Sequence, residues 1–220
     1  MKKRHQQAIR CLITAGPTRE FFDPVRYLSN PSSGKMGYAL ATAAVMQGWH
    51  VDLVSGPTAL AKPEGVTRYS ITTGEEMLYQ VQALFKNCTI LIKAAAVCDF
   101  RPKHYSPQKL KKTGVADWTV TMTPVPDILA TIAKTKSPGQ LVVGFAAETQ
   151  DLETNAWEKL QRKKLDGIVV NQVGKADTGF ESDTNTMLLL GKQGERIDLG
   201  HGPKDILARQ LILRLSEWVN

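Results

Sequence analysis

Cysteine is scarce in this chain of 220 residues, and long apolar runs are missing. Its cysteines, Cys11, Cys88 and Cys98, form no C-x-x-C pair and no metal-ligand spacing, which argues against a disulfide framework and a structural zinc site. No run of 18 apolar residues occurs, so the sequence predicts no membrane-spanning helix. Residues 1–7 are basic, but they lack the apolar core and cleavage site of an export signal. We therefore expect a cytoplasmic protein.

Positive charge predominates, with 28 Lys and Arg against 21 Asp and Glu and a net charge of +7. Such an excess is typical of proteins that bind nucleic acids, anionic surfaces or phosphorylated small molecules. The basic residues are spread along the chain, except for the run K-L-K-K at residues 109–112. No basic stripe with interleaved aromatic residues and no known nucleic-acid-binding motif is present. We therefore expect anionic small ligands rather than nucleic acid.

Short apolar runs alternate with amphipathic stretches along the chain. Strands are predicted at residues 9–15, 50–55, 66–71, 89–97, 118–122, 141–146 and 167–171. Helices are predicted over residues 36–47, after a capping box of Thr73 and Glu76, after Pro126 and Asp127, and over residues 152–164 and 204–218. This alternation predicts an α/β fold with a Rossmann-like, doubly wound, mainly parallel sheet. Residues 186–199 predict a small antiparallel hairpin, and we expect a single domain over residues 1–220.

Four polar or Gly/Pro-rich segments follow predicted strands, at residues 16–37, 56–63, 99–117 and 145–151. Ligands of such sheets bind outside the carboxyl ends of the strands. The first segment ends in the turn N-P-S-S-G-K-M-G at residues 30–37, directly before a predicted helix. It has no G-x-G-x-x-G next to the strand, and Met36 replaces the hydroxyl residue of a G-x-x-x-x-G-K-[ST] loop. The segment therefore matches neither of these two nucleotide-binding motifs.

The turn at residues 30–37 nevertheless has the chemistry of an anion site. Ser32, Ser33 and Gly34 precede a helix, where free backbone N–H groups and the positive end of the dipole attract anions. Lys35 adds a cation beside them. A serine that only caps the helix is the alternative interpretation.

Other polar residues allow more than one interpretation from their spacing alone. Asp99 follows a predicted strand and could bind a metal, a ribose or an amine, or cap a loop. The lysines at residues 109–112 are typical of a solvated face or of a lid over a triphosphate. Lys159 and Lys163 share one helical face and are typical of a solvated surface. The four histidines show no ligand spacing.

Ordered motifs cover nearly the whole chain. They are residues 13–20 (I-T-A-G-P-T-R-E), 23–27 (D-P-V-R-Y), 29–30, 32–37, 94–99 (A-A-A-V-C-D), 109–112, 126–128 (P-D-I) and 142–149 (V-V-G-F-A-A-E-T), followed by Asn171, Phe180, Ser182, Asp183 and Asn185. This set resembles phosphopantothenoylcysteine synthetase. The resemblance implies a ligase of coenzyme A synthesis that uses CTP with Mg²⁺. The carboxylate of 4′-phosphopantothenate attacks the α-phosphate and releases pyrophosphate, and the amine of L-cysteine then displaces CMP.

The resemblance also implies roles for individual residues. Asn30 matches an asparagine near the reacting carboxylate, and Lys109 matches a lid lysine that neutralises charge in the transition state. These two are the predicted catalytic residues. The predicted nucleotide contacts are Ser32, Ser33, Gly34, Ala94, Ala95, Asp99, Pro126, Asp127, Ile128, Leu129, Phe145, Lys159 and Lys163. Arg26 and Asn30 are predicted to bind the acid substrate, with Arg19 as a second candidate for its phosphate, and no metal ligand is predicted.

Some features depart from the bacterial pattern or leave alternatives open. Val125 stands where that pattern has Asn, and Cys98 where it has Ala. Residues 29–37 resemble the CTP-using form more than the ATP-using one, which remains the alternative. The first strand begins by residue 9, so we expect neither the decarboxylase domain fused to bacterial relatives nor its flavin. Family members dimerise, often by extending strands across the two-fold axis, and we expect a homodimer with the hairpin at residues 186–199 as its arm.

Two further classes of protein compete with the ligase. A nicotinamide-dependent oxidoreductase requires a glycine fingerprint after the first strand and an acidic residue closing the second, which here ends in V-S-G-P. A non-catalytic module that binds nucleotides or nucleic acid agrees with the positive charge and predicts no release of pyrophosphate.

Overall fold

The computed structural model describes residues 8–112, 117–148, 151–172 and 181–219. Its centre is a sheet in the order β12-β11-β10-β9-β6-β1-β4-β5. The strands from β10 to β5 are parallel, and β11 and β12 are antiparallel to their neighbours. The bounds are β1 Arg10–Ala15, β4 His50–Ser55, β5 Val66–Ser70, β6 Ile90–Lys93, β9 Leu141–Glu148, β10 Gly167–Gln172, β11 Thr184–Gly191 and β12 Arg196–Pro203. The predicted mainly parallel sheet with an antiparallel extension is confirmed.

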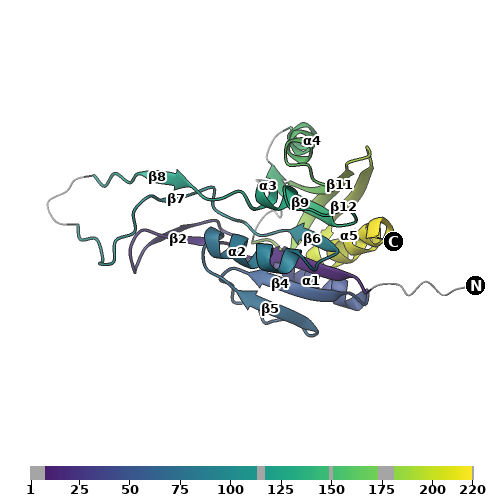
Figure 1. Ribbon diagram of the computed structural model, residues 1–220, viewed down its shortest axis with the longest axis horizontal. Helices are drawn as coiled ribbons and strands as arrows, with labels where there is room; N and C mark the ends of the chain where they lie inside the picture. Colours follow the sequence, from purple (N-terminus) through teal and green to yellow (C-terminus); the bar gives the residue numbers. More distant parts are fainter. Residues whose placement is uncertain (1–7, 113–116, 149–150, 173–180, 220) are drawn as a thin grey trace, which may run out of the picture.

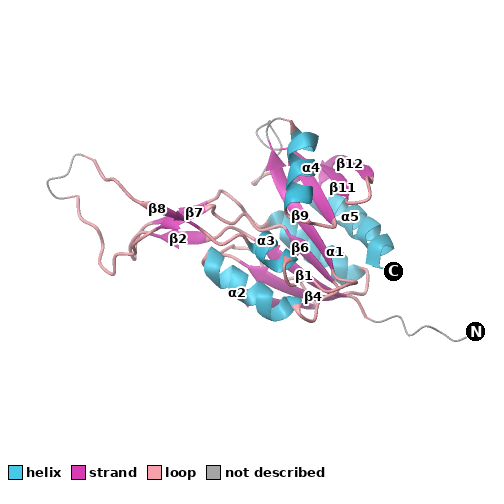
Figure 2. Ribbon diagram, turned by 45° about the horizontal axis from the view of Figure 1, so that its top comes forward, coloured by secondary structure: helices cyan, strands magenta, loops and turns pink. Residues whose placement is uncertain are grey.

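Helices cover both faces of this sheet (Figures 1 and 2). Successive side chains of a strand point to opposite faces, so Leu12 and Ile13 of β1 are fully buried in two different cores. The Ile13 core includes α1 Lys35–Met46 and α5 Lys204–Val219. The Leu12 core includes α2 Gly74–Phe85, α3 Ile128–Ala133 and α4 Leu152–Arg162. Both faces are therefore buried, as the apolar strands predict.

Local sequence signals determine where two of the helices begin. The predicted capping box is present: the Thr73 hydroxyl accepts from the Glu76 N–H at 3.2 Å, and the Glu76 carboxylate accepts from the Thr73 N–H at 3.3 Å. Asp127 caps α3 by accepting from the N–H of Ala130 at 3.1 Å. This cap places the residues before α3 at the carboxyl edge of the sheet.

Two small hairpins form an arm that projects from the sheet (Figures 1 and 2). We use "arm" for residues 19–29, 100–112 and 117–124. It contains β2 Arg19–Phe21 paired with β3 Tyr27–Ser29, and β7 Phe100–Pro102 paired with β8 Met122–Pro124. The Ser106 N–H donates to the Phe22 carbonyl at 2.9 Å and links the two parts. Six large apolar side chains of the arm are exposed: Val25, Tyr27, Leu28, Phe100, Tyr105 and Trp118.

Three local predictions were wrong. Of the strand predicted at residues 118–122, only Met122 lies in a strand, because Trp118 packs against the Phe22 ring at 5.3 Å instead of entering a ladder. The strand predicted at residues 89–97 ends at Lys93, and the chain then follows the loop after β1, with Ala96 bridging Pro17. The loop predicted at residues 145–151 overlaps the strand predicted at residues 141–146, and it begins too early, because β9 continues to Glu148.

A buried ion cluster joins elements at the edge of the sheet opposite the predicted site. The Asp166 side chain is 2% exposed and pairs with Lys136 at 2.7 Å and Lys192 at 2.6 Å. Its carboxylate also accepts from the backbone N–H of Val142 at 2.8 Å. Burial raises the pKa of Asp166, but the hydrogen bonds from the two lysines outweigh it and bring the pKa below its ordinary value.

No helix within the part of the chain that the structure describes is long and apolar enough to cross a membrane.

Candidate active site

Two adjoining cavities lie at the carboxyl ends of the central strands. We call the first the turn cavity, and it has a volume of about 260 Å³. It is lined by Asn30, Ser32, Gly34, Lys35, Met36, Gly37, Lys93, Ala94, Ala95, Ala96, Val97, Asp99, Phe145, Ala146, Ala147, Lys159, Asn171, Asn185 and Lys204. The second, the α3 cavity, has about 210 Å³ and is lined by Lys93, Val97, Cys98, Asp99, Val125, Pro126, Asp127, Ile128, Leu129, Phe145, Lys159 and Lys163. The shared residues make the two cavities contiguous.

Most residues predicted from the sequence meet in these two cavities. Asn30, Ser32, Gly34, Ala94 and Ala95 line the turn cavity. Pro126, Asp127, Ile128, Leu129 and Lys163 line the α3 cavity, and Asp99, Phe145 and Lys159 line both. Ser33, Lys109 and Arg26 line neither. Ser33 instead faces a neighbouring cavity that also contacts Asn30 and Arg19.

The turn at residues 30–37 is held against the segment that follows β6. The Asn30 amide donates to the carbonyls of Ala96 and Val97, both at 3.2 Å. At the other end of the turn, a Cβ at Gly37 would lie 2.5 Å from the Cβ of Ala15, so glycine allows α1 to approach β1 closely. These contacts place the start of α1 at the wall of the turn cavity.

The start of α1 has no side-chain cap. Its N-cap is Gly34, with φ of 80°, and its first turn contains no acidic residue. The Ser32 and Ser33 hydroxyls accept from the N–H groups of Gly34 and Lys35 at 3.4 and 3.5 Å, and neither caps the helix. The alternative of an ordinary serine cap is therefore wrong. An uncapped helix start at a cavity wall suits an anionic ligand.

Three lysines gather where the two cavities join. Lys93 donates to the carbonyl of Ala95 at 2.9 Å, and Lys163 pairs with Asp127 at 2.9 Å. Burial, together with the nearby charges of Lys159 and Lys163, lowers the pKa of Lys93 to about 8. Burial raises the pKa of Asp127, but hydrogen bonds from Lys163 and Ala130 outweigh it and lower the pKa overall. The cluster favours an anionic ligand.

Sequence reasoning missed Lys93. The available signal was a lysine closing the otherwise apolar strand I-L-I-K, directly before the small residues at 94–96. A charged residue at the carboxyl end of a buried parallel strand points to a site, because ligands bind at that edge of the sheet.

Arg26 and Lys109 lie on the arm. Arg26 pairs with the buried Asp23 at 3.1 Å and donates to the carbonyl of Leu110 at 2.8 Å. The same Asp23 carboxylate accepts from the Leu110 N–H at 3.1 Å. Arg26 and Asp23 thus hold the segment that contains Lys109 against the arm. The catalytic role of Lys109 and the binding role of Arg26 stay predictions.

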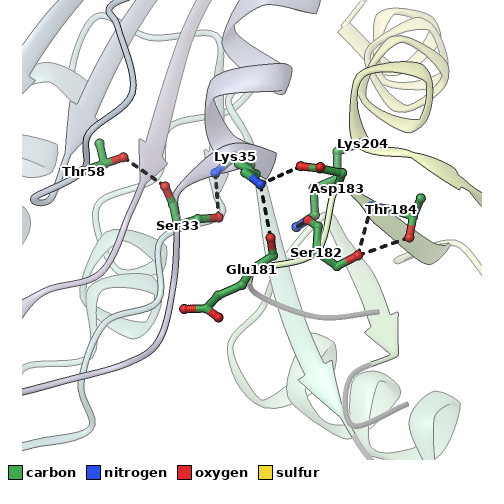
Figure 3. A network of polar contacts seen from close by, with 8 residues as sticks. All are labelled: Ser33, Lys35, Thr58, Glu181, Ser182, Asp183, Thr184 and Lys204. Carbon is green, nitrogen blue, oxygen red and sulfur yellow. Dashed lines mark hydrogen bonds and ion pairs between the residues drawn. The ribbon is translucent and has the colours of Figure 1, made fainter. Parts of the chain in front are cut away.

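A polar network contains two of the lysines that line the turn cavity, Lys35 and Lys204 (Figure 3). Lys35 pairs with the Asp183 carboxylate at 2.5 Å and donates to the Glu181 carbonyl at 3.2 Å. Lys204, the first residue of α5, donates to the Ser182 carbonyl at 2.5 Å. Burial lowers the pKa of Lys204, and the charge of Lys35 lowers it further. The segment before β11 therefore joins the starts of α1 and α5 beside the cavity.

Comparisons with known proteins give the family to which the chain belongs. The family model "DNA/pantothenate metabolism flavoprotein C-terminal domain" matches residues 6–219. The coenzyme A biosynthesis bifunctional protein CoaBC of Vibrio vulnificus strain CMCP6 is 45% identical over 206 residues, which cover 93% of this chain and 51% of that protein. CoaBC of Escherichia coli K12 is 43% identical, covering 93% and 50%. The chain thus spans about half the length of these relatives.

Solved structures extend the comparison. A crystal structure of the C-terminal domain of CoaBC is 39% identical with a TM-score of 0.83, and the match covers 97% of this chain and 96% of that one. A Cab2 mutant in complex with phosphopantothenate-cysteine is 19% identical with a TM-score of 0.74, covering 96% and 87%, and shows the fold alone. The chain belongs to the family of the DNA/pantothenate metabolism flavoprotein C-terminal domain.

Proposed function

We propose that the chain is a phosphopantothenate–cysteine ligase of coenzyme A biosynthesis. The observation that carries the proposal is the pair of contiguous cavities, which combine an uncapped helix start with a cluster of lysines. The relatives at 45% and 43% identity are named for coenzyme A biosynthesis, which supports the same activity. The Cab2 structure contains phosphopantothenate-cysteine, the product that this ligase would form.

The proposed reaction has two steps. A carboxylate oxygen of 4′-phosphopantothenate bonds to the α-phosphorus of CTP, and the bond to the β-phosphate oxygen breaks to release pyrophosphate. The cysteine amine then bonds to the acyl carbon, loses a proton, and displaces CMP. A carboxylate is already ionised at neutral pH, so the first step requires no general base. Positioning and charge neutralisation should supply most of the rate enhancement.

The cavity residues divide this work. The N–H groups at the start of α1 and the hydroxyl of Ser32 face the triphosphate. Lys93, Lys159 and Lys163 neutralise its charge from the α3 side. Asn30 fixes the turn against the segment after β6 and thereby sets where the carboxylate meets the α-phosphate. Residues 126–129 enclose the nucleoside.

Mg²⁺ is proposed as a companion of the triphosphate. Among the described residues, no group of three or more His, Cys, Asp or Glu side chains could hold a metal ion. This scarcity of protein ligands fits Mg²⁺ held mainly by phosphate oxygens and water, with Asp99 as the carboxylate that lines both cavities. When bound, the ion would supply charge neutralisation at the phosphates.

We also propose a homodimer that forms through the arm. The hairpin suggested from the sequence, β11 with β12, forms the edge of the main sheet, whereas the arm projects and carries six exposed apolar side chains. A second copy of the chain would cover that apolar surface.

A cytoplasmic location is supported by the three cysteines, which are all buried and free.

One assay tests the proposed activity. The purified chain is incubated with 4′-phosphopantothenate, L-cysteine, Mg²⁺ and either CTP or ATP, and products are separated by chromatography. We expect the cysteine adduct, pyrophosphate and CMP with CTP. Formation of the adduct with ATP alone would support the ligase activity but would show that its nucleotide is ATP rather than CTP. No adduct with either nucleotide would refute the ligase. In separate assays, reduction of a nicotinamide cofactor would then identify an oxidoreductase, and nucleotide binding without turnover would identify a non-catalytic module.

A further inference from the structure

The carboxylate of Asp23 is fully buried in the arm, and its two oxygens have different partners. Oδ1 accepts from the backbone N–H groups of Val25 at 2.7 Å and Arg26 at 2.9 Å. Aspartate commonly stabilises a tight turn in this way, and here the turn joins β2 to β3. Oδ2 accepts from the N–H of Leu110 at 3.1 Å and from the guanidinium of Arg26 at 3.1 Å. The second oxygen therefore binds a segment that is distant in the sequence.

Asp23 and Arg26 together bind both backbone groups of Leu110. Its N–H donates to Asp23, and its carbonyl accepts from the Arg26 guanidinium at 2.8 Å. These two bonds connect residues that are 87 and 84 positions apart in the chain. Burial raises the pKa of Asp23, but the N–H groups of Val25, Leu110 and Arg26 outweigh it and lower the pKa. We use "clamp" for the side chains of Asp23 and Arg26 with the backbone of Leu110.

The clamp fixes a long connection to the β2–β3 hairpin. This connection joins β7 to β8 over residues 103–121, and its described part contains no helix or strand. Connections longer than about 12–15 residues without secondary structure are usually functional or disordered. Before the clamp, the Ser106 N–H donates to the Phe22 carbonyl at 2.9 Å. After it, the Trp118 ring lies 5.3 Å from the Phe22 ring and 5.7 Å from the Arg26 guanidinium. Both ends of the connection are thus held by the same hairpin.

The clamp binds the backbone of a lysine run without using its ammonium groups. Leu110 is half-buried, whereas the lysines at residues 109, 111 and 112 are exposed. Like charges repel one another, so such a run gains little from becoming ordered on its own. The bonds at Leu110 order it from outside the run. The same hairpin leads directly into Asn30, which follows β3. One hairpin therefore connects the two predicted catalytic residues, Asn30 and Lys109.

We propose that Asp23 is a positioning residue that acts through Lys109. Its carboxylate fixes the backbone of Leu110 on the β2–β3 hairpin and thereby sets where the neighbouring lysine lies. Asp23 lines neither the turn cavity nor the α3 cavity, so we assign it no contact with a substrate. The inference rests on the proposed ligase function. The competing interpretation is that Asp23 only stabilises the arm.

A double-mutant cycle distinguishes these two interpretations. Asp23→Asn keeps the oxygen that stabilises the turn but replaces Oδ2 with an NH₂ donor, so it releases Leu110 and retains the turn. We expect kcat to fall about tenfold, because small displacements of reacting groups cost up to about 100-fold. The KM for CTP should stay within about twofold of the wild type. In a Lys109→Met background, Asp23→Asn should lower kcat less than about twofold, because the group that it positions is already gone.

The control background is Lys111→Met, on the other side of Leu110, where Asp23→Asn should keep its full effect of about tenfold. A tenfold loss that persists in the Lys109→Met background would assign Asp23 to the stability of the arm and overturn the inference. An unchanged kcat in Asp23→Asn would also overturn it. Asp205→Asn, at an exposed carboxylate of α5, is the matched substitution and should leave kcat unchanged.

Cleavage by trypsin reports on the clamp without any need for activity. Release of Leu110 should speed cleavage after the lysines at residues 109, 111 and 112 at least about fivefold, because local opening exposes the backbone. Asp205→Asn should be cleaved at the wild-type rate. Equal cleavage of Asp23→Asn and the wild type would show that Asp23 does not hold this segment and would overturn the inference.

A second variant covers the case in which Asp23→Asn does not fold. Leu110→Pro removes the N–H that Asp23 accepts and leaves Asp23 in place. It should lower kcat, and the effect should disappear in the Lys109→Met background. An unchanged kcat in Leu110→Pro would overturn the inference.

The wild type separates failure of this inference from failure of the proposed function. If the wild type forms the cysteine adduct but the effects of Asp23→Asn and Lys109→Met simply multiply, the inference fails and the ligase stands. If the wild type forms no adduct, the ligase is refuted, and the role of Asp23 in its reaction is refuted with it.

Discussion

Asn30 connects the two segments between which the proposed reaction takes place. Its amide donates to the carbonyls of both Ala96 and Val97, so a shorter side chain releases the turn from the segment after β6. We predict that Asn30→Ala lowers kcat by about 100-fold, because small displacements of reacting groups have effects of that size. The Tm should fall by a few degrees, because two hydrogen bonds worth about 1 kcal/mol each are lost. Steady-state kinetics will measure the effect, with Asn87→Ala, at an exposed residue outside both cavities, as the control. Wild-type turnover in Asn30→Ala would remove Asn30 from the site.

The lowered pKa of Lys93 predicts that kcat/KM for the nucleotide depends on pH. Its ammonium is mainly charged below its pKa of about 8 and mainly neutral above it. If that charge binds CTP, kcat/KM for CTP should fall as the pH rises past about 8. Lys93→Met should remove this alkaline decline and lower the value at neutral pH, whereas Lys93→Arg should move the decline to higher pH. An unchanged decline in Lys93→Met would assign it to another group.

The pKa of Lys93 also determines the sign of its effect on stability. Because the folded pKa lies below the ordinary value of 10.5, the unfolded chain binds more protons between about 8 and 10.5. The contribution of Lys93 to the free energy of unfolding therefore rises with pH across this window. Lys93→Met should flatten this rise in urea unfolding experiments.

At the level of single residues, the sequence predicted which residues have the chemistry of a site better than it predicted which residues they contact. Ser32 and Gly34 were identified because a polar turn before a helix is a local signal. Lys93 was missed because its importance depends on Lys159 and Lys163, which are more than 60 residues away in the chain. The contact of Asp23 with Leu110 likewise depends on packing that no local pattern encodes.

Among the secondary-structure elements, the ion cluster of Asp166 should matter for stability. It ties Lys136 and Lys192 to the start of β9, and its own side chain is 2% exposed. We predict that Asp166→Ala lowers the free energy of unfolding by about 2–4 kcal/mol, below the largest values for buried pairs because the lysines are partly exposed. Asp205→Ala, which breaks an exposed pair with Arg209, should cost less than about 0.5 kcal/mol.

The contribution of the Asp166 ion cluster to stability should be lost in acid. The folded pKa of Asp166 lies below its ordinary value, so its contribution is present above the unfolded pKa and is lost as the pH falls through the folded one. Urea unfolding at neutral and acid pH should therefore show the difference between the wild type and Asp166→Ala shrinking in acid. A difference that is equal at both pH values would contradict the ion pairing.

Periodic elements could be predicted from the sequence, and irregular ones could not. The capping box of Thr73 and Glu76 and the apolar run of β4 are local signals, and both were confirmed. The arm was missed because its strands are three residues long and its packing links Phe22 to Trp118. The alternation around Trp118 reflects that packing rather than a strand.

At the scale of the whole molecule, the arm is the part that projects, and Arg26 and Lys109 lie on it rather than in the cavities. The exposed apolar side chains of the arm predict an interface with a second copy. We expect the wild type to sediment as a dimer at micromolar concentration and Val25→Glu to weaken the dimer at least about tenfold, because a charge would be buried. Met46→Glu is the control, since Met46 is 65% exposed on α1, outside the arm. A monomeric wild type, or an unaffected Val25→Glu dimer, would exclude this interface.

At this scale the sequence predicted the mainly parallel sheet with helices on both faces, because strand and helix signals alternate along the whole chain. It also predicted that the segments after β1 and β6 gather at the carboxyl ends of the strands, but not that they form two contiguous cavities with residues inside β9, which depends on the strand order. That residues 1–220 form a single domain stays a prediction.

The most direct test of the account follows an oxygen atom. With 4′-phosphopantothenate labelled with ¹⁸O in its carboxylate, the proposed acyl-cytidylate leaves one labelled oxygen on the phosphate of CMP when cysteine displaces it. We predict, by mass spectrometry, one ¹⁸O atom in CMP and none in pyrophosphate. Unlabelled CMP formed together with the cysteine adduct would contradict attack of the carboxylate on the α-phosphate.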